Sequence, residues 1–210
     1  MTLPPTGSDV ATTFLRWTSL RAVCHRGYVL VSGLYFVVDA HLSASELLVL
    51  GTVVAATMVL SDIPTGVWSD TVSRLWPIVL GHGFLGAGMV MTGVVTAFPL
   101  ILVTQVLWGL GWSFSTGADV AWVTDELDRP DRIARVLTVR ARRDLLGQAT
   151  GIVAFGALGW AVGLATAIVV SGVAMALLGV FVAVRFTESS AGCPCFQAGE
   201  EPKGCHGFCR

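Results

Sequence analysis

Residues 61–77, SDIPTGVWSDTVSRLWP, join two long apolar segments through a very short polar turn. The first apolar segment ends at Gly66, and the second begins at Leu75. Between them lie two charged residues, Asp70 and Arg74. Crossing a bilayer core of ~30 Å takes about 20 apolar residues in an α-helix. The stretch therefore predicts two membrane-spanning helices that meet over a tight hairpin.

The composition of the whole chain favours a membrane protein. Of its residues, 54% are hydrophobic and only 13% are charged, which is unlike a soluble domain of this length. The abundance of small and β-branched residues also differs from the alternating pattern of a transmembrane β-barrel. We therefore expect an all-α polytopic membrane protein. Its six transmembrane helices are predicted at residues 17–38, 47–67, 75–96, 100–123, 145–163 and 165–184.

The distribution of basic residues predicts the topology. If the chain starts in the cytoplasm, every Lys and Arg falls in an inner segment or in the first helix, and the outer loops hold none. This positive-inside pattern predicts six crossings of the cell membrane with both termini in the cytoplasm. The basic residues are Arg16, Arg21, Arg26, Arg74, Arg129, Arg132, Arg135, Arg140, Arg142, Arg143, Arg185, Lys203 and Arg210.

The predicted bundle occupies residues 14–186 and has a polar tail on each side. Residues 1–13 are expected to be a cytoplasmic tail, because they lack the pattern of a removable signal peptide. Residues 187–210 contain four cysteines and a histidine, for which we considered a zinc site. The Cys-Pro-Cys spacing is not a usual zinc pattern, so we expect no metal. A disordered end, of the kind that a shift of reading frame produces, is the preferred interpretation.

Arg26 is the first candidate for a functional residue. The apolar residues that follow it, up to Ala40, are too few to cross a bilayer at ~1.5 Å of rise each. The first helix must therefore begin earlier and draw Arg26 into the membrane, where a cation is costly unless it faces a polar cavity or an anion. Two interpretations stay open: Arg26 lines a transport path, or it extends to the inner headgroups along its aliphatic stem.

The second predicted helix contains Asp62 and Pro64 near its inner end. Proline kinks a helix because it lacks a backbone donor, and a carboxylate within the membrane is a candidate for function. Three roles stay open for Asp62: it pairs with Arg26, it carries a proton, or it only anchors the hairpin.

Asp119 is predicted to take part in an ion pair at the inner end of the bundle. It precedes Asp125, the start of the next inner loop, by about one and a half helical turns, which places it near the depth of Arg74. We therefore predict an ion pair between Arg74 and Asp119. The loop itself, residues 125–144, is expected to be broken at Pro130 and to continue as a short separate helix.

Glycines in the third and fifth predicted helices are expected to be packing positions, since small residues let helices approach closely in lipid. His82, in the third helix, is expected to be a hydrogen-bonded core residue. The glycines are Gly81, Gly83, Gly86 and Gly88 in the third helix, and Gly147, Gly151, Gly156, Gly159 and Gly163 in the fifth.

The hairpin sequence GVWSDTVSR resembles the loop between the second and third helices of the major facilitator superfamily. Gly66, Ser69, Asp70, Ser73 and Arg74 match the pattern of that loop. The strings DIPTG and GADVAW also resemble the corresponding helix ends of facilitator-type exporters. The chain departs from the family where a basic residue usually follows the loop aspartate, and it lacks the arginine common in the fourth helix of exporters.

The resemblance implies a six-helix half of a facilitator, arranged as 3+3 inverted repeats. It further implies secondary active transport by alternating access, with export of small amphiphilic molecules. In this interpretation the substrate cavity is lined by Arg26, Tyr35, Asp62, Gln105 and Trp108. The inner gate contains Gly66, Asp70, Arg74 and Asp119, and Asp70 latches the two halves of the transporter.

The partners implied are a small-molecule substrate, a proton or other coupling ion, membrane lipid, and a second six-helix half or a homodimer that completes the cavity. No cofactor and no nucleic acid are expected. The alternative is a truncated half without transport activity, which persists as a scaffold or a nonfunctional fragment. A membrane enzyme is not expected, because the sequence has no nucleophile or metal-helix motif of the known hydrolase types.

Overall fold

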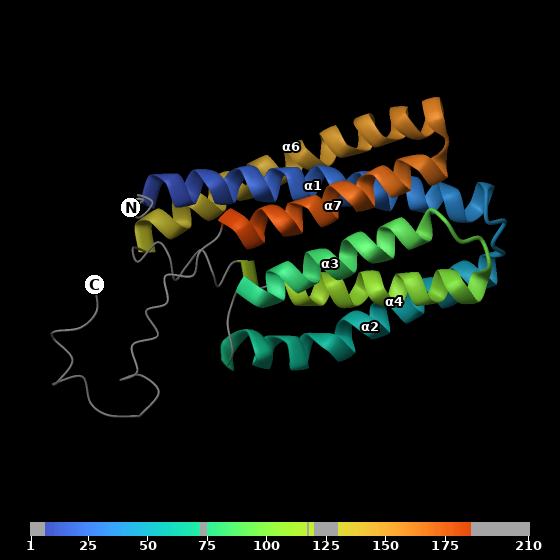
Figure 1. The fold of residues 1–210 in the computed structure, drawn as a ribbon, viewed down its shortest axis with the longest axis horizontal. Coiled ribbons are helices and arrows are strands. Elements are labelled where there is room, and N and C mark those ends of the chain that lie inside the picture. Colours follow the sequence, from blue (N-terminus) through green and yellow to red (C-terminus); the bar gives the residue numbers. More distant parts are fainter. Residues whose placement is uncertain (1–6, 72–74, 117, 120–129, 186–210) are drawn as a thin grey trace, which may run out of the picture.

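The computed structural model of this chain describes residues 7–71, 75–116, 118–119 and 130–185, which form a bundle of long α-helices (Figure 1). These residues contain no β-strand, so the predicted all-α class is confirmed for the part of the chain that they cover. The helices are α1 (Gly7–Val38), α2 (Ala44–Thr71), α3 (Leu75–Thr92), α4 (Phe98–Ser115), α6 (Pro130–Val162) and α7 (Leu164–Arg185).

Five of these helices, α2, α3, α4, α6 and α7, are long and apolar enough to cross a membrane. The sixth, α1, is 32 residues long but carries three arginines along its length, and it is not among the five. The described helices therefore have the character of a multi-pass membrane protein.

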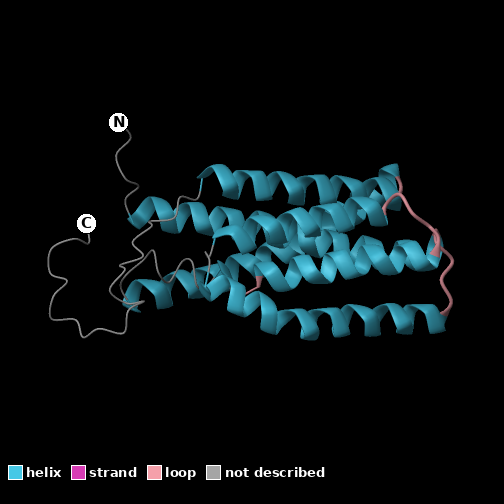
Figure 2. Ribbon diagram, turned by 60° about the horizontal axis from the view of Figure 1, so that its bottom comes forward, coloured by secondary structure: helices cyan, strands magenta, loops and turns pink. Residues whose placement is uncertain are grey.

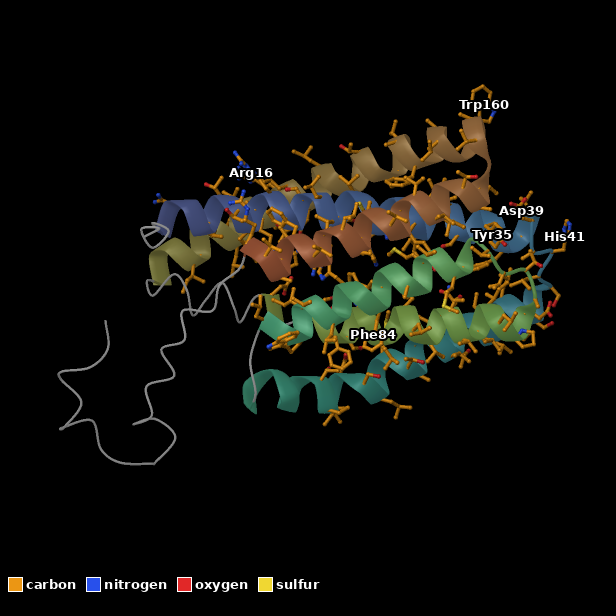
Figure 3. All side chains as sticks on the ribbon, in the orientation of Figure 1. Arg16, Tyr35, Asp39, His41, Phe84 and Trp160 are labelled. Atoms are coloured by element: carbon orange, nitrogen blue, oxygen red, sulfur yellow. The ribbon has the colours of Figure 1, made fainter. Side chains whose placement is uncertain are left out.

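Successive helices run in opposite directions along the bundle (Figures 1 and 2). As a result α1 and α6 begin, and α7 ends, at the same end of the molecule. We call this the basic end, and the opposite one the distal end. Figure 3 shows Arg16 toward the basic end, and Tyr35, Asp39 and His41 at the distal end. Arg21, Arg135, Arg140, Arg142, Arg143 and Arg185 also lie toward the basic end.

The expectation of a loop at residues 125–144, with a short separate helix after Pro130, is corrected from Pro130 onward. One continuous helix of 33 residues, α6, begins at Pro130 and includes the predicted fifth membrane helix up to Val162. Proline suits the first position of a helix, where its missing N–H has no partner to lose. Ile133 and Val136 are half-buried and pack against the core. Their apolar contacts explain why the charged segment stays helical.

The hairpin after α2 is also shorter than expected. α2 continues through Pro64 and Gly66 to Thr71, and α3 begins at Leu75. At the distal end, α6 and α7 are joined at Gly163, whose φ of 95° lies in the left-handed region that glycine adopts without strain. The turn at Gly163 leaves α6 and α7 antiparallel and in contact, whereas α2 packs mainly on α4 rather than on α3.

Close backbone contacts hold α1 and α6 together in a parallel arrangement. A Cβ added at Gly147 would lie 2.9 Å from the carbonyl oxygen of Ser19, and one at Gly151 would overlap the carbonyl of Val23. One turn further along, Phe155 of α6 covers Gly27 of α1. Each step is four residues on both helices, so the two run side by side in constant register.

α3 lies between α4 and α7 and packs closely on both. A Cβ added at Gly81 would lie 2.9 Å from the carbonyl oxygen of Gly111 in α4, and one at Gly86 would lie 3.0 Å from that of Gly172 in α7. The predicted packing role is thus confirmed for these α3 glycines and for Gly88. It is wrong for Gly83, where a Cβ would meet no atom within 4 Å.

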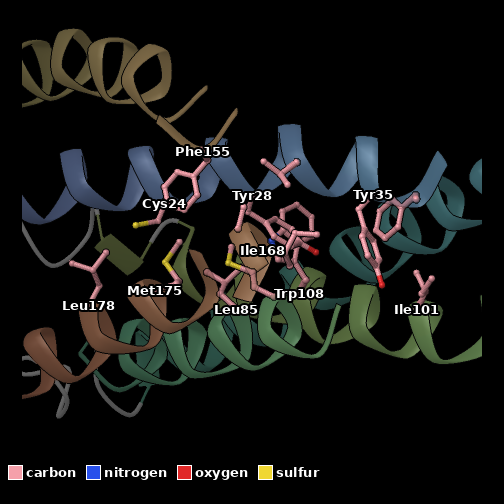
Figure 4. Close-up of a cluster of buried hydrophobic side chains, with 14 of the residues drawn as sticks. Cys24, Tyr28, Tyr35, Leu85, Ile101, Trp108, Phe155, Ile168, Met175 and Leu178 are labelled. Carbon is pink, nitrogen blue, oxygen red and sulfur yellow. The ribbon is translucent and has the colours of Figure 1, made fainter. Parts of the chain in front are cut away.

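Aromatic and aliphatic side chains from all these interfaces form one buried core (Figure 4). Tyr28 of α1, Leu85 of α3 and Ile168 of α7 are at most 1% exposed. His82 is fully buried, and its Nδ1 lies 2.8 Å from the carbonyl oxygen of Ile78. The prediction that His82 is a hydrogen-bonded core residue is therefore confirmed.

The two α3 glycines predict opposite responses to the same substitution. Gly81→Ala places a methyl group against the backbone of α4, and overpacking of this kind costs about 1–3 kcal/mol. Gly83→Ala meets open space and gains helix propensity, so we expect an unchanged or slightly higher stability. Unfolding midpoints in mixed detergent micelles measure both variants. Equal losses at the two positions would contradict the close approach of α3 and α4.

Candidate functional site

A buried carboxylate near the basic end binds arginines from two other helices. The Asp119 side chain is 2% exposed, and its Oδ2 lies 3.0 Å from Nη2 of Arg21 in α1 and 2.6 Å from Nη2 of Arg140 in α6. Nε of Arg140 lies 3.5 Å from Oδ2 of Asp144, one turn further along α6. These four residues, which we call the Asp119 cluster, tie α1 and α6 to the segment that follows α4.

Aromatic rings surround both arginines of the Asp119 cluster. The guanidinium carbon of Arg21 lies 5.1 Å from the ring centre of Trp17 and 5.9 Å from that of Trp112, and the guanidinium of Arg140 lies 5.4 Å from Phe14. Cations over aromatic faces are attracted by the negative ring surface, and more strongly where water is excluded. The rings therefore compensate part of the cost of burying two guanidinium groups.

A cavity of about 260 Å³ lies next to the Asp119 cluster, between α1, α4 and α6. Its wall is polar on α1 and α6, whereas α4 contributes the ring of Trp112. The lining residues that carry its chemistry are Arg21, His25, Arg26, Trp112, Asp144 and Gln148.

Stacked rings build one wall of this cavity. The imidazole of His25 lies 4.2 Å from the ring centre of Trp112 at an interplanar angle of 24°, and 5.5 Å from Trp108. Trp108 in turn packs on Tyr28 with ring centres 5.9 Å apart. The stack runs from the cavity into the core, so His25 is held as part of a rigid aromatic wall.

A network of neutral polar side chains crosses the core beyond the stack. Nε2 of Gln105 donates to the hydroxyl of Tyr28 at 2.9 Å and to Oγ1 of Thr92 at 3.2 Å. Thr92 donates to Oγ1 of Thr104 at 2.8 Å. The network joins α1, α3 and α4, and each hydroxyl in it has a partner, as polar groups inside an apolar bundle require.

Two of the predicted cavity residues, Gln105 and Trp108, lie in this buried core rather than on an exposed face. Tyr35 is also buried, and its hydroxyl donates to the carbonyl oxygen of Val95 at 3.0 Å. This bond ties the end of α1 to the α3–α4 connection at the distal end. None of the three lines the cavity between α1, α4 and α6.

The structure does bring Arg26 to that cavity, where its side chain is exposed. Asp62 is exposed on α2, and within the described residues it forms no ion pair with Arg26. A Cβ added at Gly66 would meet no described atom within 4 Å, so Gly66 forms no close helix contact with the described residues.

The predicted pair between Arg74 and Asp119 lies outside the described residues, because Arg74 is not among them. The side chain of Asp70 is outside them as well, although its backbone belongs to α2. The cysteines of the predicted C-terminal tail also lie outside. In the described part of the chain, no three side chains of the metal-binding types gather into a candidate site.

Sequence reasoning missed the partners that Asp119 has in the structure. In the sequence, Arg21 is only one of several basic residues of the inner segments and first helix, and Arg140 and Asp144 fall in the expected loop. The spacing in α6 does contain a signal: Arg140, Asp144 and Gly151 are four and seven residues apart, which places all three on one face of a helix. A continuous face of two charges followed by a packing glycine indicates one helix that buries its charges against a neighbour.

A scan against protein-family models finds no family that matches this chain, and a search of curated proteins finds no match.

Removing the charge of Asp119 leaves Arg21 and Arg140 without that buried counterion. Breaking a buried pair in this way costs about 3–5 kcal/mol, so we expect Asp119→Asn to lower the free energy of unfolding by that order. Asp39→Asn is the matched control, because Asp39 is exposed at the distal end. Unfolding midpoints in mixed micelles report both variants, and equal midpoints would contradict the role given to Asp119.

Proposed function

We propose that this chain is a six-helix half of a secondary transporter of the major facilitator type, which moves small amphiphilic molecules across the membrane by alternating access. The observation that carries the proposal is the charged cavity between α1, α4 and α6. A second six-helix half, or a second copy of the chain, completes the path. A coupling ion, such as a proton, drives it.

The depth of the cavity supports this proposal. Arg26 lies 12 residues before Val38, the last residue of α1, or ~18 Å along the helix. Gln148 lies 14 residues before Val162, the last residue of α6, or ~21 Å. In a core of ~30 Å both lie well inside the hydrocarbon region. A charged side chain at that depth is rare unless it faces a water-filled cavity or another polar group, which is what a substrate path provides.

The pattern of helix contacts supports a 3+3 arrangement. The main contacts join α1 with α6 and α7, α3 with α4 and α7, α2 with α3 and α4, and α6 with α7. Exchanging α1 with α4, α2 with α6 and α3 with α7 reproduces the same set of pairs. A set that is unchanged by this exchange is what two three-helix repeats predict.

The Asp119 cluster fits the inner gate of such a transporter. Arg21 belongs to the first three helices, whereas Asp119 and Arg140 follow the fourth. The cluster thus links the two proposed repeats at the basic end, next to the cavity. Opening the path at that end requires these charges to separate or to move together, so the cluster biases the equilibrium between open and closed states.

We place the protein in the cell membrane. By the positive-inside rule, we propose that its basic end faces the cytoplasm. Single cysteines at Ser45 and Arg142, both exposed, test this orientation after the five native cysteines are replaced by serine. We expect a membrane-impermeant maleimide to label Ser45→Cys in intact cells and Arg142→Cys only in inverted vesicles. The reverse pattern would overturn the orientation.

Transport is tested by blocking the cavity. Gln148→Trp fills it from α6, whereas Ala149→Trp adds the same ring at the next, exposed position. We expect proteoliposomes with the Ala149→Trp chain to show counterflow of 2-naphthoate or 2-naphthylmethylammonium, and Gln148→Trp to reduce it at least about tenfold, since a filled site loses the binding energy on which transport depends. If the chain is strictly monomeric by native mass and shows no counterflow of either ion, the transport proposal is wrong. The alternative of a truncated half without transport activity would then remain.

A further inference from the structure

We propose that the cavity between α1, α4 and α6 binds an organic anion with an aromatic ring. This inference rests on the proposed function, because it names the class of substrate for the same cavity. Three features of the described residues carry it: buried polar atoms that lack partners within them, one positive charge that forms no ion pair within them, and an aromatic wall.

Two side chains that line the cavity have nitrogen atoms without a hydrogen-bond partner among the described residues. They are Nη1 of Arg21 and Nε2 of His25, and both atoms are buried. Buried polar atoms are bonded in the great majority of cases, and in the proposed complex the ligand supplies the partners of these two. An arginine nitrogen can only donate, which favours a ligand oxygen. Oδ1 of Asp144 is likewise unpartnered, and it suits a hydroxyl or N–H elsewhere on the ligand.

The charge around the cavity also favours an anion. Among the described residues, Arg21 and Arg140 are balanced by Asp119 and Asp144 within the Asp119 cluster. Arg26 lines the same cavity and forms no ion pair with any described residue. The described site therefore carries one surplus positive charge at membrane depth, where a carboxylate or sulfonate would neutralise it.

The remaining wall suits a flat ring. Trp112 lines the cavity, and its ring contacts the imidazole of His25 and the guanidinium of Arg21. The volume of about 260 Å³ is close to the lower limit of roughly 300 Å³ for small-molecule sites. A ligand of one or two rings with a single anionic group matches this size.

The affinities of three naphthalene derivatives test the charge preference. 2-Naphthoate, 2-naphthamide and 2-naphthylmethylammonium share one ring system and carry a negative, zero and positive charge. Binding to the full chain in lipid nanodiscs is measured by calorimetry, with empty nanodiscs as the blank for partition into lipid. We expect 2-naphthoate to bind at least about tenfold more tightly than the amide, as one charge-assisted hydrogen bond provides, and the ammonium to bind most weakly. Equal affinities, or tighter binding of the ammonium, would overturn the proposal.

Substitutions on α1 locate the site. Arg26→Gln should lower the affinity for 2-naphthoate to that for the amide, whereas Arg26→Lys should keep the preference for the anion because it keeps the charge. Arg16→Gln is the matched control: the same change on the same helix, at an exposed residue that lines a separate apolar pocket against α7. Equal affinities of the Arg26→Gln and Arg16→Gln chains for 2-naphthoate would overturn the assignment to this cavity.

The outcomes also separate this inference from the proposed transport. Tight binding of 2-naphthoate without counterflow of either ion would overturn transport and leave the anion site. Counterflow of the ammonium, with no preference for 2-naphthoate in binding, would overturn the anion site and leave transport.

Discussion

The cost of placing charge inside an apolar helical bundle governs the arrangement of this protein. Asp119 is almost fully buried, and Arg21 and Arg140 reach it from two different helices. An isolated charge would lose its hydration with no compensation, whereas these groups share short contacts and lie against aromatic rings. Because the partners come from α1, from α6 and from the segment after α4, none of these elements can shift alone without exposing a buried charge to an apolar surrounding.

Close packing through glycine brings the charges into place. Gly147 and Gly151 let α6 lie against the backbone of α1 in a constant four-residue register. That register sets Asp144 and Gln148 beside the face of α1 that carries Arg21 and Arg26, where the cavity forms. Van der Waals contact between backbones is a main source of helix association in lipid. The polar site therefore depends on close backbone contacts that involve no charged side chain.

Particular residues show how far sequence reasoning reached. The helical class and the core position of His82 follow from local composition, and the structure confirms both. The α3 glycines differ: Gly81 contacts α4, whereas Gly83 faces open space. Which side of α3 is covered depends on which helices pack against it, and the sequence of α3 does not contain that information. Arg140 and Asp144 were assigned to a loop because charge counts against a membrane segment. In the structure their charges are neutralised within the bundle, so the same residues extend a helix.

The sequence by itself determined the helical, multi-pass character of the chain and the gathering of its arginines toward one end, because both depend on which residues lie within a few helical turns of one another. Only the tertiary structure decided which carboxylate meets which arginine, and that Gln105 binds Tyr28 while Tyr35 binds the backbone at Val95. These contacts join residues that are distant in sequence. Their geometry follows from the register between packed helices, which close backbone approach sets and which no single segment contains.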